Sequence, residues 1–140
     1  MEKEVIIDIV AKQKTADNED TMSVTTVGTF SGNEDDYKVV YSDMEGELAG
    51  STTTLRVQNK EMVTMTRDGS YSSQLIIEKQ RRHNCHYMTP YGELVMGVFA
   101  KDVKSEVDEN GGKLEFKYTI DFNSGLVCVN HMTISIKGAN

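Results

Sequence analysis

Hydrophobic and polar residues alternate along most of this chain with a period of two, not with the 3.6-residue period of a helix. Segments rich in Val, Ile, Thr, Tyr and Phe are separated by Gly, Asn and Asp, the pattern of consecutive β-strands joined by turns. Connections this short favour antiparallel hairpins between sequence neighbours. The predicted strands are Glu4–Lys14, Met22–Phe30, Tyr37–Asp43, Thr52–Gln58, Glu61–Thr66, Tyr71–Glu78, Arg81–Met88, Glu93–Val107, Lys113–Phe122 and Leu126–Lys137.

The last two predicted strands form the clearest hairpin. Apolar side chains occupy every second position on both, and Asn123-Ser124-Gly125 between them is a three-residue loop with glycine where a left-handed residue is needed. Both apolar rows then lie on the same face. The predicted pairs are Phe122 with Leu126, Ile120 with Cys128, Tyr118 with Asn130 and Phe116 with Met132.

The turn after Arg67 is predicted to be a loop with an odd number of residues. An odd loop places Val63 and Met65 on the same face as Tyr71, Leu75 and Ile77, whereas a two-residue turn would set them opposite polar residues. The acidic clusters Asp17–Asp20 and Glu34–Asp36 are expected to fall in loops between strands.

Long strands with one apolar and one polar face have to enclose a shared core. A face-to-face sandwich and a closed barrel both achieve this, and closure also removes the exposed edges that would aggregate. The length of the final strands favours the barrel. We therefore predict an all-β fold, a single antiparallel up-and-down β-barrel of about 8–10 strands, forming one domain over residues 1–140.

Charge and cysteine content narrow the partners and the compartment. The net charge of −7 disfavours nucleic acid and anionic membrane surfaces as partners, because binding to either depends on an excess of Lys and Arg. The basic cluster Lys79–His83 is short and is interpreted as solvated charge at a strand end. Two cysteines without a CxxC pattern, and no signal-peptide pattern, predict a cytoplasmic protein without disulfides.

A series of motifs resembles a known family. Tyr41 is followed by the Thr-rich segment 52–54, then by Arg67-Asp68-Gly69, by Tyr87-Met88-Thr89-Pro90-Tyr91-Gly92 and by the final hairpin. This spacing resembles the YwiB-like family of small bacterial proteins, a domain of unknown function. Where that family tends to place an aromatic residue and then a glycine, this chain has Ile77 and Gln80. The resemblance implies a calycin-like, that is lipocalin-like, β-barrel and implies no activity.

Residues capable of metal or nucleophilic chemistry do not converge in the predicted strands. His83 and Cys85 face one side of their strand and His86 the other, and Cys128 and His131 are divided in the same way. Cys128 is interpreted as a small buried hydrophobe, whereas the position of Cys85 is ambiguous. No catalytic constellation is found, so we expect no enzyme, no metal and no cofactor.

Polar residues on the inward rows are the candidate site. Tyr118 and Asn130 face each other inside the final hairpin, Tyr87 and Tyr41 are expected to share that interior, and Arg67 closes a strand at the rim. Such residues form either a hydrogen-bond network that fixes the barrel or a pocket for one small ligand.

Three functional hypotheses remain open. The favoured one is a non-enzymatic barrel that binds a small, largely apolar ligand in its interior through these five residues. The alternative is a structural or protein-interaction barrel with a filled core, including a homodimer, acting through an outward patch. The third is a hydrolase or isomerase that uses an interior Tyr, Arg or Cys. The outward patch would consist of Val95, Phe99, Val127 and Val129.

Overall fold

The computed structural model describes residues 2–42, 51–69, 73–89, 92–122 and 125–138, and the side chains at 87–89, 93–94, 122 and 125–127 lie outside that description. It contains ten strands, in agreement with the predicted pattern. They are β1 (Glu2–Lys14), β2 (Glu19–Gly32), β3 (Asp36–Ser42), β4 (Thr52–Gln58), β5 (Met62–Asp68), β6 (Ser73–Glu78), β7 (Arg82–Thr89), β8 (Gly92–Asp108), β9 (Gly111–Phe122) and β10 (Gly125–Gly138).

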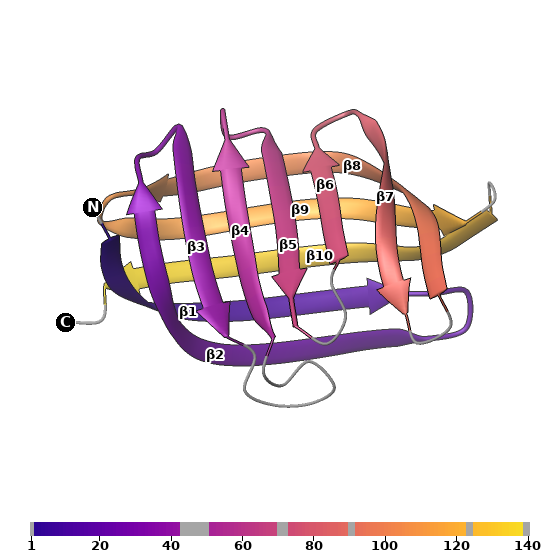
Figure 1. The fold of residues 1–140 in the computed structure, drawn as a ribbon, viewed down its shortest axis with the longest axis horizontal. Coiled ribbons are helices and arrows are strands. Elements are labelled where there is room, and N and C mark those ends of the chain that lie inside the picture. Colours follow the sequence, from indigo (N-terminus) through magenta and orange to yellow (C-terminus); the bar gives the residue numbers. More distant parts are fainter. Residues whose placement is uncertain (1, 43–50, 70–72, 90–91, 123–124, 139–140) are drawn as a thin grey trace.

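The strands form an antiparallel barrel in sequence order. Each strand pairs with the next, and β1 pairs with β10 to close the circle. The predicted up-and-down barrel is therefore confirmed. Figure 1 shows that β3 to β7 cross steeply over the layer made by β8, β9, β10 and β1. This is orthogonal packing, in which the corners are strands that pass from one layer into the other.

The two corner strands are β2 and β8, and each has a local feature that lets it bend. β2 pairs with β1 along its length but with β3 only from Gly28 onward. A Cβ atom on Gly28 would lie 2.3 Å from the carbonyl oxygen of Val40, so glycine is required at this bend. In β8 the pairing with β9 shifts between Ala100 and Asp102, and a bulge of this kind bends a strand.

β2 is longer than its hydrophobic pattern predicts. It begins at Glu19, so Glu19 and Asp20 lie in a strand and not in the loop to which they were assigned. They pair with Lys14 and Gln13 of β1. The strand extends here because these residues pair with β1, although apolar residues do not alternate along this part of the chain. Asp36 is likewise the first residue of β3 and not a loop residue.

The register of the final hairpin is confirmed at three of the four predicted pairs, Ile120–Cys128, Tyr118–Asn130 and Phe116–Met132. The fourth was wrong, because Phe122 pairs with Gly125 and Leu126 pairs with Asp121. A register shift between Leu126 and Cys128 restores the predicted pairing further along. The connection is one residue shorter than expected, and the extra residue sits in the strand as a bulge.

The odd loop after Arg67 is also confirmed. Arg67 pairs with Ser73, Met65 with Leu75 and Val63 with Ile77, which leaves five residues between the first pair. The one-residue slip that would have turned this apolar row outward does not occur. Tyr71 and the end of the predicted strand at Asp43 lie outside the described residues.

Between the two layers lies one hydrophobic core. Phe116, Leu114, Leu55 and Ile134 are fully buried within it, while Ile120 and Met132 are half-buried and pack against it. Both cysteines are buried and free. None of the described residues belongs to a helix with the length and apolar character needed to cross a membrane.

Backbone pairing around the barrel is sparsest between β6 and β7. The two strands share one paired position, Ser73 with Tyr87, and a bridge between Glu78 and Arg81 at their turn. Between these points the backbone N–H of Ile76 donates to the Sγ atom of Cys85 at 3.3 Å. A buried thiol on β7 thus accepts the hydrogen bond of a backbone donor on β6.

Candidate ligand-binding site

The layer of β3 to β7 is called the front layer here, and the layer of β8, β9, β10 and β1 the back layer. Two predicted site residues and the backbone of a third lie in one row across the front layer. Tyr41 on β3 pairs with Thr53 on β4, and Thr53 pairs with Arg67 on β5. Arg67 pairs with Ser73 on β6, which in turn pairs with Tyr87 on β7. Residues aligned in this way share one level of the sheet, so the row crosses the interior at the end of the strands where β5 finishes.

The other two predicted residues form a second row on the back layer. Tyr118 on β9 pairs with Asn130 on β10, and Asn130 pairs with Gln13 on β1. Tyr118 and Asn130 are both buried, whereas Gln13 is exposed. The sequence therefore places a phenol and two amides side by side on the inner surface of this layer.

Arg67 connects the two rows. Its Nε donates to the Oγ1 atom of Thr53 at 3.3 Å, and Thr53 is fully buried. Burial raises the pKa of Tyr118 to about 12; the nearby Cys128 raises it as well, while the positive charge of Arg67 lowers it. The guanidinium of Arg67 on β5 thus contributes to the electrostatics of the buried phenol of Tyr118 on β9.

Cys128 is the acceptor for the amides of the back layer. Asn130 donates from Nδ2 to its Sγ atom at 3.2 Å, and Gln13 donates from Nε2 at 3.6 Å. Sulfur is a weak acceptor, so both amide groups keep capacity for stronger oxygen acceptors. Arg67, Thr53, Tyr118, Cys128 and Asn130 are called the polar cluster from here on.

Side-chain burial decreases along β1 and β2 beside the polar cluster. The inward-facing side chains of β1 become more exposed toward this end of the strand, from Ile9 at 4% exposed to Gln13, which is exposed. On β2 the inward side chains Val24 and Met22 are 41% and 57% exposed, although they follow the same row as buried Phe30. Gln13, Met22 and Val24 form what is here termed the mouth, and its rim is mainly apolar.

The predicted site is thus brought together in large part. Arg67, Tyr118 and Asn130 converge, Tyr41 is buried in the same cross-strand row, and the side chain of Tyr87 lies outside the described residues. Thr53, Gln13 and Cys128 were not predicted to contribute. Thr53 and Gln13 could have been found, because each continues an inward row by strand alternation.

The residues considered for metal or nucleophilic chemistry have other partners. The Nε2 atoms of His83 and His131 lie 2.9 Å from Glu78 and 2.7 Å from Glu115. Burial raises the pKa of the Cys85 thiol, which disfavours the nucleophilic thiolate. In the part of the chain that the structure describes, no three His, Cys, Asp or Glu side chains are grouped as metal ligands would be.

Two hollows lie away from the polar cluster, at the opposite end of the barrel. The first has a volume of about 180 Å³, below the usual range for ligand pockets, and Lys3 closes over it by donating to the Glu109 carbonyl. It is lined by Lys3, Val5, Phe30, Glu109, Asn110, Gly111, Ile136 and Gly138.

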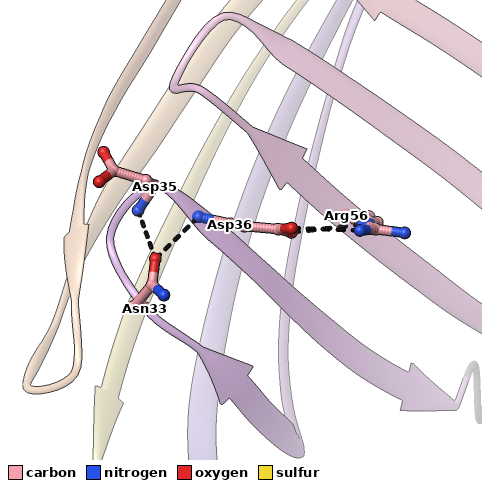
Figure 2. Close-up of polar contacts among 4 residues, drawn as sticks. All are labelled: Asn33, Asp35, Asp36 and Arg56. Carbon is pink, nitrogen blue, oxygen red and sulfur yellow. Dashed lines mark hydrogen bonds and ion pairs between the residues drawn. The ribbon is translucent and has the colours of Figure 1, made fainter.

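The second hollow, of about 360 Å³, is a surface depression between the β2–β3 turn and β4. Lys38 and Arg56 are the two cations that line it, and Figure 2 shows that Arg56 is held by the Asp36 carboxylate, with the closest atoms 3.1 Å apart. Asn33 fixes Asp36 by accepting the backbone N–H groups of Asp35 and Asp36 at 2.9 and 3.0 Å. These contacts belong to the β2–β3 turn and its neighbour β4, so this hollow is interpreted as part of the turn.

The predicted outward patch is only partly exposed. Val95 and Val129 are exposed large hydrophobics, Phe99 is half-buried, and the side chain of Val127 lies outside the described residues. Phe99 and Val129 both pair with Thr119, so these two lie in one cross-strand row on the outer surface.

Comparisons with known proteins agree with this architecture. A family model described as "Domain of unknown function (DUF1934)" matches residues 7–134. The fold is similar to the crystal structure of the ywiB protein from Bacillus subtilis, with a TM-score of 0.86 and 19% sequence identity. That match covers 99% of this chain and 94% of the other. Among curated proteins none matches this chain.

Proposed function

This chain belongs to the family described as a domain of unknown function (DUF1934), and we propose from its own geometry that it is a non-enzymatic protein that binds one small molecule inside the barrel. The ligand would be largely apolar with one anionic or hydrogen-bond-accepting group. Its apolar part would enter through the mouth and its polar group would meet the polar cluster. The observation that supports the proposal is that the buried pair Tyr118 and Asn130 faces the same interior as half-buried Arg67, whose Nε donates to buried Thr53.

The position of Arg67 favours a ligand with an acceptor group. The side chains of Arg56, Arg81 and Arg82 are between half and three-quarters exposed. Arg67 is half-buried, and its Nε donates to the hydroxyl of buried Thr53. A guanidinium gains most from a carboxylate or phosphate where water is partly excluded, because the effective dielectric is lower there.

The rest of the site matches an apolar body. Half-buried Ile120 and Met132 flank the Tyr118–Asn130 pair along the strands and pack against the core, and the mouth presents Met22 and Val24. Methionine side chains are flexible and adapt to ligands of different shape. Small-molecule sites commonly combine such an apolar lining with a few convergent polar groups.

Binding of a fluorescent fatty acid and of the matching fatty alcohol would test the proposal. The wild-type chain is expected to bind the carboxylate more tightly, and Arg67→Met should weaken carboxylate binding by about 10- to 100-fold while leaving the alcohol nearly unchanged. Arg56→Met is the matched control, because Arg56 pairs with Asp36 at the other end.

Native mass spectrometry of the protein purified from its own source provides an independent test. A bound mass lost in Arg67→Met would support the proposal. Bare polypeptide in every preparation, together with no binding of either probe, would rule it out.

A further inference from the structure

The first nine residues of β2, Glu19–Val27, carry an unpaired strand edge. On one side this segment pairs with β1 throughout, but β3 begins to pair with β2 only at Gly28. Among the described residues no strand pairs with the other edge of Glu19–Val27, which in Figure 1 is the lower margin of the back layer. An open edge exposes backbone N–H and C=O groups that can pair with another strand.

Beyond its two acidic residues, Glu19 and Asp20, this edge lacks the features by which proteins usually protect such strands. Lysine, proline, glycine and bulges prevent edge-to-edge pairing, and none of them occurs in Thr21–Val27. These seven residues are Thr, Met, Ser, Val, Thr, Thr and Val, an uncharged run of high β-propensity in a chain with a net charge of −7. Nearly all their side chains are exposed. A segment of this kind is suited to strand addition.

We propose that the edge Glu19–Val27 pairs with the same edge of a second copy of this chain, antiparallel and about a two-fold axis at Ser23. This register pairs all nine residues and is self-complementary, as a two-fold interface must be. It places Met22 opposite the partner's Val24, so that the exposed apolar residues of the inner face cover each other. The acidic Glu19 and Asp20 lie opposite the uncharged Val27 and Thr26.

The charges of the segment fit a second copy in the antiparallel orientation. Both carboxylates are at one end of the segment, so antiparallel self-pairing separates the two acidic ends by the length of the strand, roughly 25–30 Å. Parallel self-pairing would bring them side by side, where like charges destabilise. The resulting dimer has one continuous back layer through both barrels, with the two mouths on the same side of it.

The axis at Ser23 makes the test specific. Ser23 is exposed, and only at the axis does a residue meet its own copy, with Cβ atoms about 5 Å apart. Sedimentation analysis from about 1 µM to about 500 µM should show a monomer–dimer equilibrium for the wild type. Ser23→Lys and Ser23→Glu should each raise the dissociation constant by about 100-fold or more, because like charges then face each other.

An equimolar mixture of the Ser23→Lys and Ser23→Glu variants should recover the dimer as a heterodimer. Thr29→Lys is the matched control, since Thr29 is exposed on the same strand but lies where β2 already pairs with β3. A wild type that is monomeric throughout would overturn the proposal. So would a dimer that survives both single variants, because its interface would then lie elsewhere. These outcomes do not depend on whether the interior binds a ligand.

Discussion

The barrel interior has a closed end, around Phe30 and Tyr37, and an open end, beside the polar cluster. The two ends place tyrosine in different environments. At the closed end, Tyr37 packs against Phe30 with ring centroids 5.5 Å apart, and its hydroxyl meets Ser105 Oγ at 2.7 Å. At the open end, Tyr118 stacks on Phe116 but lies among Arg67, Cys128 and Asn130, beside the mouth. One phenol has a single polar partner within an apolar environment, and the other belongs to a cluster.

Under the proposed function, this difference separates an end that provides stability from an end that binds a ligand. The closed end needs one hydrogen bond to satisfy one buried hydroxyl, which is the minimum that burial of a polar group demands. The open end assembles a guanidinium, two hydroxyl groups, an amide and a thiol in a region where the apolar cover is incomplete. Under the proposed function these groups bind the polar part of a ligand, whereas in a structural barrel they would form a hydrogen-bond network that fixes the fold.

Truncation of an apolar side chain at each end is expected to give the largest contrast. Phe30→Ala should lower the free energy of unfolding by about 3–5 kcal/mol, because it removes a buried ring and leaves a cavity against Tyr37. Met132→Ala should cost less than about 2 kcal/mol, because Met132 is half-buried and solvent can fill the space. Urea denaturation measures both. Equal losses would mean that the two ends are packed equally well.

Alkaline pH provides the second contrast, through the two buried phenols. Burial raises the pKa of both Tyr37 and Tyr118 from 10.0 to about 12. A raised pKa in the folded state means that the native protein holds its proton where the unfolded chain has lost it. Stability is therefore fully present below pH 10 and falls as the pH rises from 10 to about 12, by about 2–3 kcal/mol for each phenol.

Tyr37→Phe and Tyr118→Phe should each remove the part of this alkaline loss of stability that comes from the substituted phenol. The measurement is urea denaturation at several pH values between 9 and 12, comparing how steeply stability falls and not its value at neutral pH. The double variant should show the smallest dependence. An alkaline slope unchanged in both single variants would show that neither phenol titrates with a raised pKa.

Strand alternation was sufficient to predict most of this fold. In β9 and β10 nearly every second residue is apolar, so only one register buries both rows, and three of four pairs were correct. The fourth pair was wrong because a bulge near Leu126 adds one residue to the strand and the loop is one residue shorter. The residues further along the strand keep the faces that were predicted for them. The beginning of β2 was missed for a different reason, since polar residues there become a strand by pairing with β1.

The site was predictable only to the level of which residues face inward. Alternation placed Tyr118 and Asn130 inside, and Arg67 in line with buried Met65. It could not predict that Arg67 on the front layer approaches Tyr118 on the back layer, because that distance depends on how the two layers cross. The amide bonds to Cys128 were missed because a buried cysteine next to apolar residues resembles an ordinary core position.

The smallest effect, and the most direct probe of the polar cluster, is the influence of Arg67 on the ionisation of Tyr118. The positive charge of Arg67 lowers the pKa of Tyr118, so Arg67→Met should raise that pKa further above its present value of about 12. Tyr37 is affected by burial and by Ser105, not by Arg67, and its pKa should stay the same. NMR titration of ¹³C-labelled tyrosine rings resolves the two phenols separately.

Arg56→Met is the control for this titration, because Arg56 lies with Asp36 outside the polar cluster and should shift neither phenol. The comparison of the two ends depends on the asymmetry of the result. If Arg67→Met moves Tyr118 alone, the guanidinium and the phenol share one environment that a ligand's acceptor group could enter. If both phenols move together, or neither does, Arg67 does not act inside the barrel, and the cluster with the site built on it has to be abandoned.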